Sequence, residues 1–120
     1  MNKFLNNSII KKMEIKVNKH TAETIYINHP QASYGIFCFN SVGDLFVNSD
    51  WGFYGYAWRS YGENFKEFLA GTNAEYIVGK FSINHTEVSG KKMPKHREEN
   101  LMILVNEFIK QVKVECTVSA

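Results

Sequence analysis

Residues 43–61 read GDLFVNSDWGFYGYAWRSY, and their pattern predicts the central hairpin of the fold. Residues 44–48 and 53–59 each have the composition of a β-strand, and the Asn, Ser, Asp and Gly residues between them favour a tight turn. In the second strand large aromatic residues alternate with small ones, namely Tyr54, Tyr56 and Trp58 against Gly55 and Ala57. The stretch predicts an aromatic β-hairpin whose small-residue side another element approaches closely, most simply a helix.

Three segments upstream of the hairpin also have strand character. The alternation in residues 13–17 predicts a first strand, and residues 24–28 predict a second. Residues 34–40 are apolar at nearly every position, which is typical of a central strand covered on both faces.

The pattern downstream of the hairpin changes to the helical period. Residues 63–71 predict one short helix, and a capping box at residues 72–75 opens a second that continues to residue 81. Residues 82–95 are polar and basic, as in a loop, and a longer amphipathic helix begins near residue 97. Alternation over residues 112–118 predicts a closing strand.

Strands grouped before helices indicate an α+β fold. We expect an antiparallel sheet of five to six strands, with three helices, two short and one long, packed on one face. We also expect residues 1–12 to form a flexible tail and residues 13–120 a single domain.

Composition excludes several classes of protein. A formal net charge of +2 produces no strong field toward nucleic acid or membrane, and two aspartates are too few for a mimic of the DNA phosphates. No secretory signal or membrane span is visible, so the host cytoplasm is the expected location, with Cys38 and Cys116 as free thiols.

No constellation for catalysis or metal binding is recognisable. The four histidines are scattered over predicted turns and loops, and no nucleophile motif or phosphate loop occurs. We therefore expect a non-enzymatic protein without cofactor or metal. An enzyme is the third hypothesis, and it depends on Asp44, Asp50 and Arg59 forming a pocket, although residues of these types are also ordinary turn formers and surface ion pairs.

Two surfaces are candidates for binding a partner. The first is the aromatic face with its adjacent cation: Tyr54, Tyr56, Trp58 and Arg59. If the helices cover the small-residue side, these aromatics are exposed and meet a partner; if they cover the aromatic side, the aromatics belong to the core.

The second candidate surface is the basic loop. Its cations are Lys91, Lys92, Lys95 and Arg97. Most such runs are solvated, but this one fits an electrostatic contact with an acidic protein surface or a phosphate backbone. It becomes the better candidate if the aromatics are core.

The hairpin and the segment after it resemble a family of small phage and prophage proteins. The shared elements are Ser-Asp-Trp-Gly at 49–52, Tyr-x-Trp at 56–58, Phe-Lys-x-Phe-Leu at 65–69, and then Tyr76 and Lys80-Phe81. The likeness covers residues 43–81. It implies a mobile-element origin and assigns no chemistry, so it identifies no catalytic residues.

Small phage accessory proteins often act stoichiometrically on a host machine. Our leading hypothesis is a phage or prophage protein that inhibits a host defence nuclease, such as a CRISPR effector, by protein-protein binding. The alternative is a small single-stranded nucleic-acid-binding module that uses the sheet aromatics and the basic loop.

Overall fold

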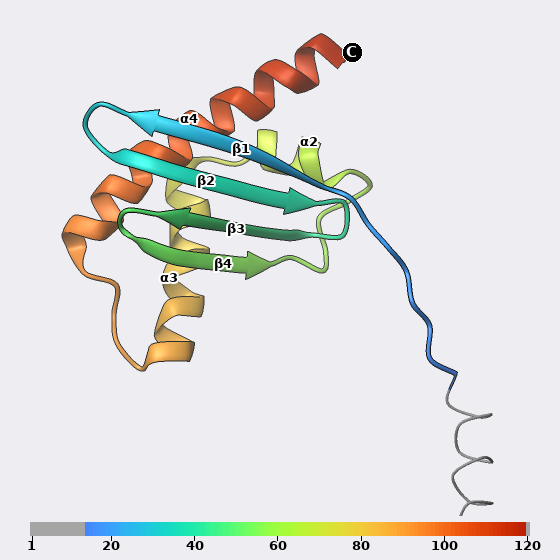
Figure 1. Cartoon of the computed structure of the whole chain (residues 1–120), viewed down its shortest axis with the longest axis horizontal. Helices are drawn as coiled ribbons and strands as arrows, with labels where there is room; N and C mark the ends of the chain where they lie inside the picture. The colour runs from blue at the N-terminus through green and yellow to red at the C-terminus, as the bar shows by residue number, and fades with distance from the viewer. Residues whose placement is uncertain (1–13, 120) are drawn as a thin grey trace, which may run out of the picture.

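The computed structural model describes residues 14–119, which form a sheet and a layer of helices (Figure 1). The sheet is an antiparallel meander in the order β1-β2-β3-β4. Its strands are β1 Ala22–His29, β2 Ser33–Asn40, β3 Asp44–Ser49 and β4 Gly52–Ala57. All four correspond to strands predicted from the sequence.

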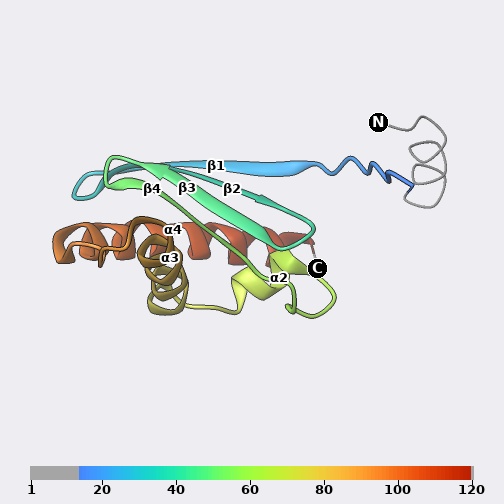
Figure 2. The ribbon, with the colours of Figure 1, turned by 90° about the horizontal axis from the view of Figure 1, so that it is seen from below.

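The helices α2 Phe65–Ala70, α3 Ala74–Ser89 and α4 Lys95–Ser119 lie together on one face of the sheet (Figure 2). Helix α4 runs beneath the sheet and contacts β1 and β2, whereas α3 contacts β4. The other face carries no helix from the described part of the chain. Among the described residues, no helix is both long enough and apolar enough to cross a membrane.

Short polar side chains shape the turns between strands. The Asn40 side-chain oxygen accepts hydrogen bonds from the backbone N–H groups of Val42 and Asp44, each at 3.0 Å. In the next turn the Ser49 hydroxyl accepts from the Trp51 N–H at 3.2 Å and donates to the Gly52 carbonyl at 2.8 Å. These local bonds hold β2, β3 and β4 in consecutive hairpins.

The core lies between the sheet and the helices. Phe37 of β2 stacks on Phe108 of α4, with ring centroids 4.5 Å apart and planes 12° apart. Alternate strand positions and helically spaced α4 positions fill the rest of the layer, including Phe39, Leu45, Val47, Leu101, Leu104, Val105 and Val112. The two periodicities are those expected of strands and helices that each bury one face.

Two predicted strands are corrected. Residues 14–17 are extended and exposed but pair with no strand in the described structure, and Met13 lies outside the described residues. Residues 112–118 continue α4, because Val112 and Cys116 are four residues apart and lie on the core side of the helix. The described sheet therefore has four strands rather than five or six.

The second helix is longer than predicted. The Asn73 side chain accepts a hydrogen bond from the Tyr76 N–H at 2.8 Å and begins α3, and Gly90, with φ of +72°, ends it. Beyond Phe81 the helix continues with His85, whose ring lies 5.6 Å from that of Tyr54, and with the Thr86 hydroxyl, which donates to the Ser82 carbonyl at 3.0 Å. The loop predicted at residues 82–95 is thus confined to the segment between α3 and α4.

Candidate functional site

The helices cover the aromatic side of the hairpin. Tyr54 and Trp58 are only 4% and 5% exposed. The Trp58 indole N–H donates to the Tyr76 hydroxyl at 3.0 Å, and its ring lies 5.7 Å from that of Phe65. Tyr54 and Trp58 are therefore core residues, and a partner cannot contact them in this conformation.

Tyr56 lies at the margin of the aromatic core and is only partly buried. The Lys80 ammonium of α3 lies 5.4 Å from the ring centroids of both Tyr56 and Tyr76. A cation at this distance from two rings is in cation–π range, so Lys80 occupies the space that a cationic ligand would need.

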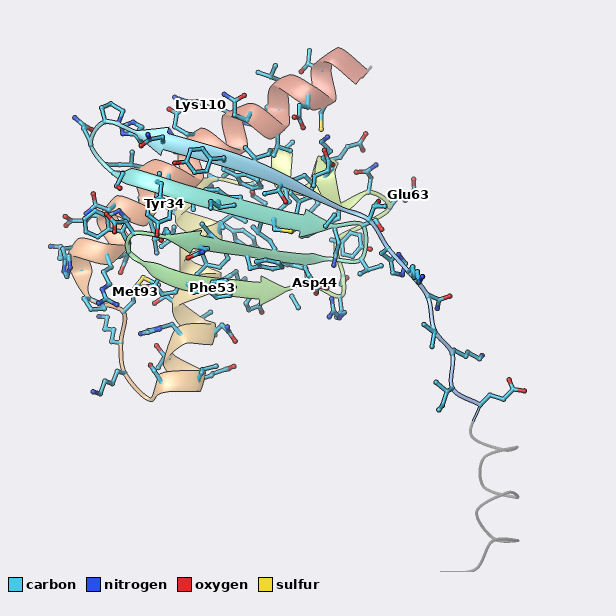
Figure 3. The ribbon with its side chains drawn as sticks, in the orientation of Figure 1. Tyr34, Asp44, Phe53, Glu63, Met93 and Lys110 are labelled. Atoms are coloured by element: carbon cyan, nitrogen blue, oxygen red, sulfur yellow. The ribbon has the colours of Figure 1, made fainter. Side chains whose placement is uncertain are left out.

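The opposite side of the sheet is an uncovered surface, which we call the open face. The strand registers place one set of side chains on it: Ala22, Thr24, Tyr26, Asn28, Tyr34, Ile36, Cys38, Asn40, Asp44, Phe46, Asn48, Phe53, Gly55 and Ala57. Figure 3 shows this face toward the viewer, with Tyr34 and Phe53 labelled. Tyr26, Phe46 and Phe53 are 61%, 40% and 66% exposed.

Phe46 and Phe53 form the most aromatic part of the open face. Their rings are stacked on neighbouring strands, with centroids 5.8 Å apart. Gly55 pairs with Phe46 across β3 and β4, and a Cβ atom on Gly55 would lie 3.2 Å from the Phe46 Cβ. The small residues of β4 therefore leave room for a cross-strand phenylalanine, and not for the helix predicted from the sequence.

The charged residue on the open face is Asp44, at one end of β3. It accepts hydrogen bonds from the Asn40 amide at 2.8 Å and the Arg59 guanidinium at 3.0 Å. The Asn40 hydrogen bond, and with it the hydrogen bond and charge of Arg59, lowers the pKa of Asp44. Asp50 follows the far end of the same strand, so it does not join Asp44 and Arg59 in a pocket.

The basic loop is exposed but firmly attached. Lys91 and Lys92 are exposed in the loop between α3 and α4. Lys95 and Arg97, which the sequence placed in the same loop, are exposed in the first turn of α4. Met93 is 2% exposed and anchors the loop in the core (Figure 3). The ring of His96 lies edge-on to Trp51 at 6.1 Å, which places the start of α4 beside the β3–β4 turn.

A cavity of about 270 Å³ opens beside β1 and α2. Within its lining, the Lys66 ammonium lies 2.9 Å from the Glu23 carboxylate, and Glu115 of α4 lies 2.8 Å from the same nitrogen. The hydrogen bonds to Glu115 and Glu23 raise the pKa of Lys66. These charges tie α2, β1 and α4 together. No described residues form a His, Cys, Asp and Glu cluster able to hold a metal.

Comparison with protein families gives a match. A model of a phage family matches residues 13–112, which is most of the chain. The chain belongs to this phage family. Comparisons with curated proteins and with solved structures find no match. In this phage protein the match extends beyond the resemblance noted at residues 43–81, and it includes the whole open face.

Sequence reasoning missed Tyr26, Phe46 and Phe53 as surface aromatics of this phage protein. A sign of a second apolar face is present only in the strand between Tyr26 and Phe46, because residues 34–40 are apolar at both odd and even positions. The run predicts a strand covered on both faces, but the structure covers only one. In the structure Phe37 and Phe39 enter the core, whereas Ile36 and Cys38 lie half-buried on the open face. This strand, apolar on both sides, therefore has one face in the core and the other on the uncovered side of the sheet.

Proposed function

We propose that this phage protein is a non-enzymatic binding protein that engages a host protein through the open face. The supporting observation is the exposure of Tyr26, Phe46 and Phe53 on one uncovered side of the sheet. Aromatic residues dominate the centres of protein interfaces because each buries a large area at low entropic cost. An uncovered apolar sheet face of this kind is typical of a surface that meets a partner.

The charge of the open face favours protein over nucleic acid as the partner. None of its strand residues is a lysine or arginine, and its one strand charge, Asp44, is paired with Arg59 at the edge of the face. Sheets that stack nucleic-acid bases surround their aromatics with cations that bind phosphates. A depletion of charge around exposed aromatics is instead what the core of a protein interface shows.

The proposed partner is a host defence nuclease, such as a CRISPR effector, which the phage protein inhibits one to one. Membership of a phage family supports this choice, since a phage benefits from blocking enzymes that cut its genome. The exposed cations Lys91, Lys92, Lys95 and Arg97 are available for a salt-sensitive contact with an acidic part of the same partner.

The test is a titration of nuclease activity. A host nuclease recovered with the phage protein is purified, and its cleavage of DNA or RNA is measured while the phage protein is added. A stoichiometric inhibitor abolishes cleavage near equimolar ratio. Inhibition at a small fraction of equimolar indicates catalysis, and full cleavage together with unchanged host immunity rejects the proposal.

Single-stranded nucleic acid is the second candidate, because exposed sheet aromatics also stack bases. Intrinsic fluorescence is a poor test, since Trp58 lies in the core and Trp51 is partly buried, with its indole N–H bound to the Ala32 carbonyl at 2.7 Å. Anisotropy of a labelled oligonucleotide at low salt measures binding directly. Affinity that falls steeply with salt, and falls further in a Lys91→Ala/Lys92→Ala variant, favours this candidate. No binding at low salt excludes it.

A further inference from the structure

The segment before β1 has the sequence of a strand but pairs with no strand among residues 14–119. We call this segment, residues 14–21, the arm. In it Ile15 and Val17 alternate with Glu14 and Lys16. Ile15 and Val17 are 88% and 78% exposed. The arm extends away from the sheet (Figure 1), yet the family match begins at residue 13 and so includes it.

The outer edge of β1 is also unpaired in the described structure. The order β1-β2-β3-β4 makes β1 an edge strand, and its pairing with β2 is regular over all eight residues, without a bulge. Its central residues Ile25, Tyr26 and Ile27 are hydrophobic, and Glu23 is its carboxylate. Long, regular, hydrophobic edges of this kind recruit further strands, and natural proteins normally protect them.

We propose that the arm of one copy pairs antiparallel with β1 of a second copy, and that the two copies exchange arms around a twofold axis at Thr21. In this register residues 14–20 of one chain lie opposite residues 28–22 of the other. The arm thus covers β1 of the second copy almost from end to end. The inference is independent of the proposed function and concerns a second copy of this chain as partner.

The register follows from complementary side chains. Ile15 lies opposite Ile27, Val17 opposite Ile25, and Lys19 opposite Glu23. Directly opposed residues in an antiparallel pair share one side of the sheet. Ile25 and Ile27 lie on the helix-covered side, so Ile15 and Val17 would extend that apolar layer.

Neighbouring registers are poorer. A shift of two residues in one direction places Val17 opposite Glu23, and the opposite shift places Lys19 opposite Ile25. A shift of one residue moves Ile15 and Val17 away from the helix layer. Glu23 can accept Lys19, because its side chain is still 51% exposed while Lys66 binds it.

The pairing restores the strand predicted from residues 13–17, but between chains. Each copy would have a fifth strand supplied by the other. Because the axis is perpendicular to the sheet, both helix layers would lie on one side and both open faces on the other.

Crosslinking at the axis tests the register. In a Cys38→Ser/Cys116→Ser background, Thr21→Cys places two thiols opposite each other, with Cα atoms about 4.5–5.5 Å apart, within disulfide range. The matched control is Lys19→Cys. The two thiols introduced at position 19 would lie about 13 Å apart along the strands, since position 19 of one chain is four residues from the position opposite it in the other. Mild oxidation is expected to give a disulfide dimer from Thr21→Cys and monomer from Lys19→Cys.

The molecular mass in solution and charge-reversal variants at positions 19 and 23 test the pairing without introduced cysteines. Light scattering of the wild-type chain is expected to give twice the monomer mass. Lys19→Glu sets two carboxylates opposite each other and is expected to weaken the dimer about fivefold, and Lys19→Glu/Glu23→Lys is expected to restore it. A wild-type monomer, or equal crosslinking of both cysteine variants, overturns the proposal. A monomeric mass is also the result expected if the arm pairs with its own β1.

Discussion

Gly43 is the residue that holds the end of the aromatic hairpin in place. Its φ is +99°, and its carbonyl accepts the Trp58 N–H at 2.8 Å. A Cβ atom at this position would lie 2.0 Å from the Trp58 carbonyl oxygen. The backbone just after β4 is therefore fixed against the β2–β3 turn, and this contact directs the Trp58 ring into the core.

Gly43→Ala is expected to destabilise the protein more than Gly62→Ala. Both glycines have a positive φ, which costs another residue about 1–3 kcal/mol. Only Gly43 adds a clash, because no atom lies within 4 Å of a Cβ at Gly62. Urea denaturation compares the two free energies of unfolding. Equal losses would show that the contact with Trp58 does not matter.

Asp44 makes stability depend on pH in the acid range. Its pKa is lowered in the folded state by Asn40 and Arg59, so folding is favoured while the carboxylate is charged. This contribution is complete above the unfolded pKa, near 4, and is lost as the pH falls through the lower folded pKa. Because Arg59 is largely exposed, the contribution is at most about 1 kcal/mol.

Asp44→Asn is expected to lower stability at pH 7 slightly and to leave it less dependent on pH below 4. Thermal melts of both proteins from pH 2 to pH 7 measure the difference. The two curves should converge at the acid end. A constant gap over the whole range would contradict the role of the Asp44 charge.

Among the helices and strands, the sequence predicted best those boundaries that depend on interactions between residues close in the chain, such as turns and helix starts. The turn-forming residues at 49–52 predicted the hairpin of β3 and β4, and the capping box at residues 72–75 predicted the start of α3, although its N-cap in the structure is Asn73, one residue further along. The prediction was wrong where the secondary structure depends on packing or pairing with segments distant in the chain. Residues 112–118 alternate like a strand but extend an established helix, and residues 14–17 alternate without a partner in the described structure.

The N-cap of α3 gives a test at this scale. Asn73→Ala removes the acceptor for the Tyr76 N–H and is expected to cost about 1 kcal/mol. Asn73→Ser keeps a capping oxygen and is expected to cost much less. Chemical denaturation measures both variants. A loss in Asn73→Ser as large as that in Asn73→Ala would show that the cap contributes little.

In the whole molecule, the exposed surface depends on which side of the sheet the helices cover. They cover one side and leave the other uncovered. The covered side could not be predicted from the sequence, because both sides of the hairpin carry aromatic residues. Tyr54 and Trp58 lie on one side, and Phe46 and Phe53 lie on the other. Packing against α2 and α3 places the first pair in the core. The second pair becomes the candidate contact surface, together with Tyr26.

The affinity of two matched variants for the host partner tests this surface most directly. Phe53→Glu places a charge on the open face, and Val88→Glu places the same charge on the exposed outer side of α3. We predict that Phe53→Glu weakens binding about 30-fold or more, equivalent to about 2 kcal/mol, while Val88→Glu binds like the wild type. Wild-type affinity in a folded Phe53→Glu variant would contradict the role of the open face.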